Sequence, residues 1–96
     1  MPKYLVERRF DVSVTPEGMP KVGEKSKRTI VEHFPNTIVW EHSHVLVDDE
    51  GRVTTFCVYE APDEETVREH AKLLGAHDIA SVREIAGDVT PADFPL

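Results

Sequence analysis

The chain has 96 residues, and its 18 acidic residues outnumber its 11 basic ones, which gives a formal net charge of −7. A chain of this length has room for one hydrophobic core, so we expect a single domain. Nucleic acids and anionic membranes are not expected as partners, because binding to phosphate depends on clustered Lys and Arg side chains, and no dense stripe of them is present in this sequence.

The cysteine content and the hydropathy pattern indicate the cellular compartment. One cysteine excludes a disulfide within the chain and is compatible with a reducing environment. No apolar run approaches the ~20 residues of a membrane span. Strand-like sequence follows Met1 without the apolar segment of a signal peptide. We therefore expect a cytoplasmic protein.

The first half of the chain predicts a strand, a helix and a second strand. Residues 3–14 are rich in aromatic and β-branched side chains and alternate with period two. Residues 21–34 carry small and apolar positions at helical spacing, and Pro35 ends this helix. Residues 37–47 again alternate and predict a long strand.

The second half predicts a hairpin, a helix and a last strand. A turn at residues 48–51, with a glycine for positive φ, leads into a returning strand over 52–60. Asp63 is the expected N-cap of a helix, and Gly75 is its expected C-terminal glycine. Residues 79–85 read as the final strand.

This order of elements predicts a fold class. Strand, helix, strand, strand, helix, strand is typical of the ferredoxin-like α+β sandwich, in which two helices cover one face of a four-stranded antiparallel sheet. We expect this domain over residues 1–86 and an irregular tail over 87–96. The open sheet face, which we expect to carry Val, Trp or Tyr side chains, favours a homodimer of the dimeric α+β barrel type.

His42 and His44 form a candidate pair of metal ligands. Because they are two residues apart in a strand, their imidazoles project from one face roughly 7 Å apart, and strict alternation places Trp40 on the same face. Neutral imidazole binds Ni, Zn and Cu, and carboxylates and water fill the other positions of an octahedral site. The alternative is a polar strand face at a subunit junction, with the histidines paired to carboxylates such as Glu41 or Glu7.

His70 is a second candidate, on the expected second helix. Val67, His70 and Leu74 recur at the spacing of a core-facing stripe, so the imidazole should point at the sheet. If Cys57 faces the helices, it shares a layer with His70, whereas otherwise Glu60 is the nearer partner. The alternatives are a hydrogen-bonded core histidine and a buried cysteine that acts as a small hydrophobe.

Glu7 lies mid-strand, where an unpartnered carboxylate is costly if it is buried. Arg8, Arg9 and Arg83 are available partners, so a salt bridge explains Glu7 without a function. The sequence has no Gly-rich phosphate loop, no His-Glu-x-x-His helix and no Cys-x-x-Cys pair. Cys57 lies in an expected strand and not at the helix N-terminus that activates a thiolate. No organic cofactor is predicted.

A family resemblance is carried by four short segments, namely Met1–Arg8, Val39–Val45, Phe56–Pro62 and Arg68–Ala71. Together, and in this order, they resemble a family of small proteins of largely unassigned function that includes an actinobacterial nickel-binding protein. The resemblance implies a ferredoxin-like subunit that dimerises through its sheet and binds metal through histidine and acidic side chains. His44 stands where family members tend to have an aromatic residue, and the hairpin at 48–53 and the tail after Ala86 also depart from the pattern.

The leading interpretation is a homodimeric protein that binds a divalent transition metal, nickel, in metal sequestration or homeostasis. Nitrogen ligands with carboxylates and water favour octahedral nickel over structural zinc, which prefers more thiolates. The residues predicted to form or support the site are His42, His44, His70, Glu7, Cys57 and Glu60.

The alternative interpretation is a small-molecule enzyme or binding protein, of the cofactor-independent monooxygenase-like or isomerase-like kind. Trp40, Tyr4 and Tyr59 then shape an apolar cavity between sheet and helices, and His70 acts as general acid or base. A third reading is a structural or regulatory dimer in which these polar groups are satisfied internally.

Overall fold

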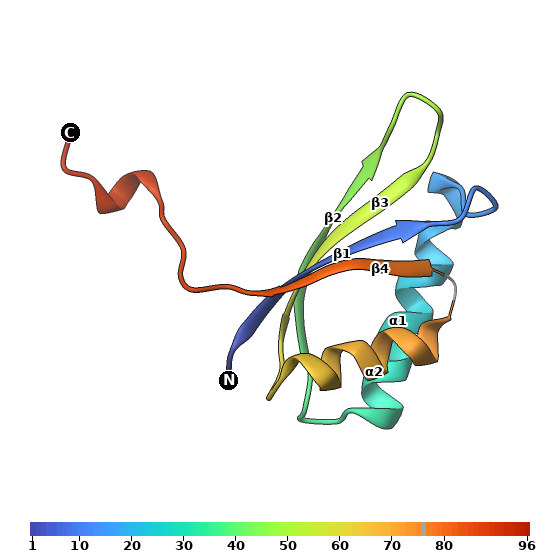
Figure 1. The fold of residues 1–96 in the computed structure, drawn as a ribbon, viewed down its shortest axis with the longest axis horizontal. Coiled ribbons are helices and arrows are strands. Elements are labelled where there is room, and N and C mark those ends of the chain that lie inside the picture. Colours follow the sequence, from blue (N-terminus) through green and yellow to red (C-terminus); the bar gives the residue numbers. More distant parts are fainter. Residues whose placement is uncertain (76) are drawn as a thin grey trace.

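Two α-helices cover one face of a four-stranded antiparallel sheet in the described part of the chain (Figure 1). The computed structural model describes residues 1–75 and 77–96. The strand order β2-β3-β1-β4 confirms the expected ferredoxin-like α+β fold. In chain order the elements, with η for a short 3₁₀ helix, are β1 (Lys3–Phe10), η1 (Pro16–Gly18), α1 (Met19–His33), β2 (Val39–Val47), β3 (Val53–Glu60), α2 (Glu64–Leu74), β4 (His77–Glu84) and η2 (Pro91–Asp93).

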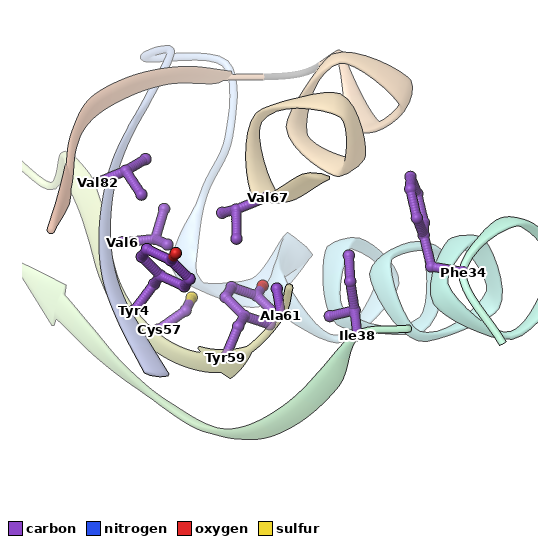
Figure 2. Packing of buried hydrophobic residues seen from close by; sticks show 9 residues of the cluster. All are labelled: Tyr4, Val6, Phe34, Ile38, Cys57, Tyr59, Ala61, Val67 and Val82. Atoms are coloured by element: carbon purple, nitrogen blue, oxygen red, sulfur yellow. The ribbon is translucent and has the colours of Figure 1, made fainter. Parts of the chain in front are cut away.

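The two central strands, β1 and β3, alternate strictly between a buried and a more exposed face. Tyr4 pairs with Tyr59 and Val6 pairs with Cys57, and all four side chains are buried beneath the helices. Figure 2 shows these side chains rising from the strands toward Val67 of α2. The core therefore lies between the sheet and the helices, and the other face of the sheet is left open.

The outer strand β2 contains an irregularity that reverses part of the expected side-chain pattern. Trp40 pairs with Tyr59, but the next paired residue is His42, so Glu41 is an extra residue in a β-bulge. Trp40 therefore faces the helices while His42 and His44 face the open side. The expectation that all three share one face is wrong because strict alternation fails at the bulge. The open face also lacks the expected Tyr side chains, because Tyr4 and Tyr59 are buried on the helix side of β1 and β3.

Helix α2 begins and ends with the predicted residues. The Asp63 carboxylate accepts a hydrogen bond from the Thr66 backbone N–H at 2.8 Å, and Gly75 adopts the left-handed conformation with φ 69°. Val67, His70 and Leu74 are buried as predicted. No helix within residues 1–75 and 77–96 is long and apolar enough to cross a bilayer.

The end of β1 differs most from the sequence-based prediction, and the start of α1 differs as well. β1 ends at Phe10, and not at Val14, because the Asp11 carboxylate accepts the Ser13 backbone N–H at 2.8 Å and turns the chain. Helix α1 begins at Met19, because η1 leads directly into it. The other strand ends lie within two residues of the expected positions.

The segment after β4 leaves the sheet and extends away from the rest of the fold (Figure 1). The Ile85 backbone N–H still donates to the Lys3 carbonyl at 2.8 Å. The expected irregular tail contains η2, which is stabilised by a 2.7 Å hydrogen bond from the Thr90 backbone N–H to the Asp93 carboxylate. Phe94 is 57% exposed in this segment.

Replacing Val67 by Ala should lower the free energy of unfolding by about 2 kcal/mol, because it removes buried methyl groups and leaves a cavity between α2 and the sheet. Val67 is 1% exposed. The matched control is Val31→Ala, a 63% exposed helix position, where the gain in helix propensity offsets the small loss of contact. Urea denaturation measures both, and equal effects in the two variants would contradict this account of the core.

Candidate functional site

The six residues predicted to form a metal site lie on opposite faces of the sheet. Cys57 points toward the helices, and His70 of α2 points toward the sheet, so these two share the buried layer. Strand pairing puts the others on the open face, namely Glu7, His42, His44 and Glu60. The predicted set therefore does not form one centre, because the sheet separates the strand histidines from Cys57 and His70.

His42 and His44 lie side by side on the open face of β2. Their ring centroids are 5.3 Å apart with an interplanar angle of 79°, and both residues are exposed. They pair with Val58 and Phe56 of β3, which are half-buried on the same face. The pair is thus accessible from solvent and can donate two imidazole nitrogens to one ion.

Carboxylates on and beside this face form ion pairs with cations of the same chain. Glu7 accepts a hydrogen bond from Arg9 Nε at 3.1 Å, and Glu41, the bulge residue, lies 3.2 Å from Lys3 Nζ. Surface pairs of this kind contribute little free energy, so a metal can compete for such carboxylates. In residues 1–75 and 77–96 no cluster of three or more His, Cys, Asp or Glu residues has the geometry of a metal site.

His70 is the centre of a hydrogen-bonded chain on the buried face. It is fully buried, with Nδ1 3.3 Å from Arg8 Nη2 and Nε2 3.3 Å from Ser26 Oγ. A guanidinium only donates, so Nδ1 accepts from Arg8 and the ring proton lies on Nε2, where it is donated to Ser26. This arrangement holds the His70 ring between β1, α1 and α2.

Arg8 is a buried cation that the sequence analysis did not assign to the site. It is 2% exposed, it donates to the Tyr59 hydroxyl at 3.3 Å, and its guanidinium carbon lies 5.4 Å from the centre of the Tyr59 ring. It does not pair with Glu7, the partner that the sequence suggests, because Glu7 binds Arg9 instead. The sequence feature that indicates its burial is the alternation of β1, which places Arg8 on the same face as Tyr4 and Val6.

The environment of Tyr59 keeps its hydroxyl protonated. Burial strongly raises the pKa of Tyr59, and the neighbouring Arg8 charge offsets part of that rise. The Cys57 thiol lies close by and is 3.6 Å from Thr55 Oγ1. The phenol is therefore neutral throughout the physiological range.

A cavity of about 560 Å³ opens between the first half of α1 and the sheet. Trp40 forms part of its wall, held by a 2.8 Å hydrogen bond from Nε1 to Ser43 Oγ. His70 does not line the cavity and lies behind Ser26 and Arg8, so direct acid or base chemistry by His70 on a molecule there is not favoured. The cavity is lined by Arg8, Phe10, Pro16, Met19, Pro20, Val22, Gly23, Ser26, Trp40, Ser43, Val45, Thr55, Cys57, Tyr59 and Leu74.

Residues 4–85 match the model of a protein family described as nickel responsive protein SCO4226-like. The chain belongs to this family. No curated protein matches it significantly. Among solved structures, the chain is similar to the protein At3g17210 from Arabidopsis thaliana, with 18% sequence identity over 94% of this chain and 96% of that one, at a TM-score of 0.47.

Replacing Tyr59 by Phe should remove the phenol that resists ionisation in the folded protein. Below pH ~10 the phenol is neutral in both the folded and the unfolded state. Above that pH the unfolded chain ionises first, so the folded protein loses stability as the pH rises. We expect this alkaline loss to be smaller in the variant. At neutral pH the variant should lose on the order of 1 kcal/mol with the Arg8 hydrogen bond.

Ultraviolet titration of phenolate checks this assignment, because the chain has two tyrosines and the variant retains only Tyr4. The unmodified folded protein should show a phenolate signal with a midpoint well above pH ~10, and this signal should be absent from the variant. If the signal that the variant lacks has instead the midpoint of a free tyrosine, Tyr59 is not buried and hydrogen-bonded as described.

Proposed function

We propose that the protein binds Ni²⁺ through His42 and His44 on the open face of the sheet, and that it serves nickel sequestration or homeostasis. Two observations support this proposal. The family to which the chain belongs is described as nickel responsive. The two imidazoles also lie side by side and exposed on one strand, with ring centroids 5.3 Å apart.

The chemistry of this face suits nickel better than structural zinc. Neutral imidazole is a good ligand for Ni²⁺, and carboxylates and water complete an octahedral site. Structural zinc sites prefer thiolates, but Cys57 lies on the other side of the sheet. Copper should bind at least as strongly as nickel to the same nitrogen pair, because divalent copper stands highest in the general affinity order.

A second copy of the chain is proposed to complete the site. Two imidazoles fill only part of an octahedral coordination sphere. Leu5 and Leu46 are 37% and 48% exposed on the same face as the histidines. A twofold dimer that covers this face would bury these apolar side chains and bring a second histidine pair and the Glu7 carboxylates to the same interface.

Isothermal titration of metal-free protein with Ni²⁺ should show stoichiometric binding that the double variant His42→Ala/His44→Ala loses, because both nitrogen donors are removed. His33→Ala is the matched control, since His33 is an exposed histidine at the end of α1 on the helical side. It should bind nickel as the unmodified protein does.

Two further results decide the location of the site. His70→Gln should leave the nickel stoichiometry unchanged, because the sheet lies between His70 and the open face. Weak binding that is the same in the unmodified protein and in the double variant would exclude the proposed site.

Replacing Leu5 by Glu should convert the proposed dimer to a monomer, because it adds a charge near the centre of the open face. Leu73→Glu is the matched control, since Leu73 is 49% exposed on α2, away from this face. Size-exclusion chromatography with light scattering measures the mass of each variant. An unchanged mass for Leu5→Glu, or an equal change for both, would place any interface elsewhere.

A further inference from the structure

The cavity between α1 and the sheet is independent of the open face and of the proposed nickel site. Its volume of about 560 Å³ falls within the range of small-molecule sites, which are mostly apolar with a few convergent polar groups. It is far larger than a space for the one or two waters that bridge buried polar groups. We propose that it binds a small aromatic molecule that carries one carboxylate.

The apolar wall favours a flat, aromatic body. Phe10 and Trp40 line the cavity from the sheet, and Met19 and Val22 line it from α1. Trp40 reaches this side only because of the bulge at Glu41. Its hydrogen bond to Ser43 satisfies the indole N–H, so the ring presents only apolar atoms to the cavity.

The polar groups in the wall favour an acceptor on the ligand. Arg8, Ser26 and Tyr59 all line the cavity, are at most 5% exposed and are joined through the chain that includes His70. A guanidinium cannot lose its charge and only donates hydrogen bonds. His70 acts here as a positioning residue that holds Arg8 and Ser26. A carboxylate at this end of the cavity would receive charge-assisted hydrogen bonds.

Gly23 lines the cavity and carries no side chain that would fill it. A glycine inside a helix is less favourable than an alanine, and Gly23 lies within α1. A Cβ added there meets nothing nearer than the Trp40 ring at 3.8 Å, an ordinary contact. The packing of the protein itself therefore does not require glycine at this position. The space beside this stretch of helix is therefore open to a ligand in the cavity.

The test uses naphthoate as the probe and compares it with naphthylmethanol, which has the same rings without the charge. Titration calorimetry of metal-free protein should show one naphthoate per chain, bound about tenfold more tightly than naphthylmethanol, as expected for hydrogen bonds to a charged group. The chain has one tryptophan, so its single indole N–H resonance in NMR spectra should shift as naphthoate is added.

Gly23→Leu should abolish naphthoate binding, because the leucine side chain extends into the cavity while α1 gains helix propensity. Gly23→Ala is the matched control, since it gives the same gain in propensity but fills little space, and it should keep most of the affinity. Both variants should retain the unmodified protein's behaviour toward Ni²⁺.

Three results would overturn the proposal: no naphthoate binding to the unmodified protein, binding that Gly23→Leu leaves unchanged, or equal affinity for naphthoate and naphthylmethanol. None of them bears on the nickel site, which lies on the other face.

Discussion

The buried guanidinium of Arg8 lies at the centre of a hydrogen-bonded chain that connects the sheet, α2 and α1. From the central strand β1 it contacts Tyr59 of β3 and His70 of α2, and His70 in turn contacts Ser26 of α1. A buried charge is costly unless its hydrogen bonds are satisfied, so these groups must keep their relative positions. The sheet and both helices are therefore held by one polar chain that lies beside the hydrophobic core cluster.

The parts of the fold that the sequence predicted well depend on local interactions. Asp63 and Gly75 mark the ends of α2 through contacts within a few residues, and the spacing of Val67 and Leu74 determines its buried face. The place of Arg8 was harder to predict, because its neighbours in the sequence are Glu7 and Arg9, and an exposed carboxylate was an equally plausible partner. Only the packing of α2 on the sheet brings His70 to it.

The candidate site was predicted incompletely for a different reason. His42 and His44 were correctly expected to share a face, since they are two residues apart. Whether Trp40 joined them depended on how β2 pairs with β3, and no feature of the sequence marked Glu41 as an extra residue. Cys57 and His70 were expected in one layer only if Cys57 faced the helices. It does, and so the two are separated from the strand histidines.

The bulge at Glu41 also determines where related chains can differ in length. Deleting Glu41 alone would restore regular pairing and leave Trp40 and His42 on their present faces. Removing one residue between His42 and Val47 would instead turn part of the strand over and move side chains from one face to the other. Relatives that are one residue shorter in this strand are therefore expected to have lost the residue at the bulge, and an alignment gap there is compatible with unchanged chemistry on both faces.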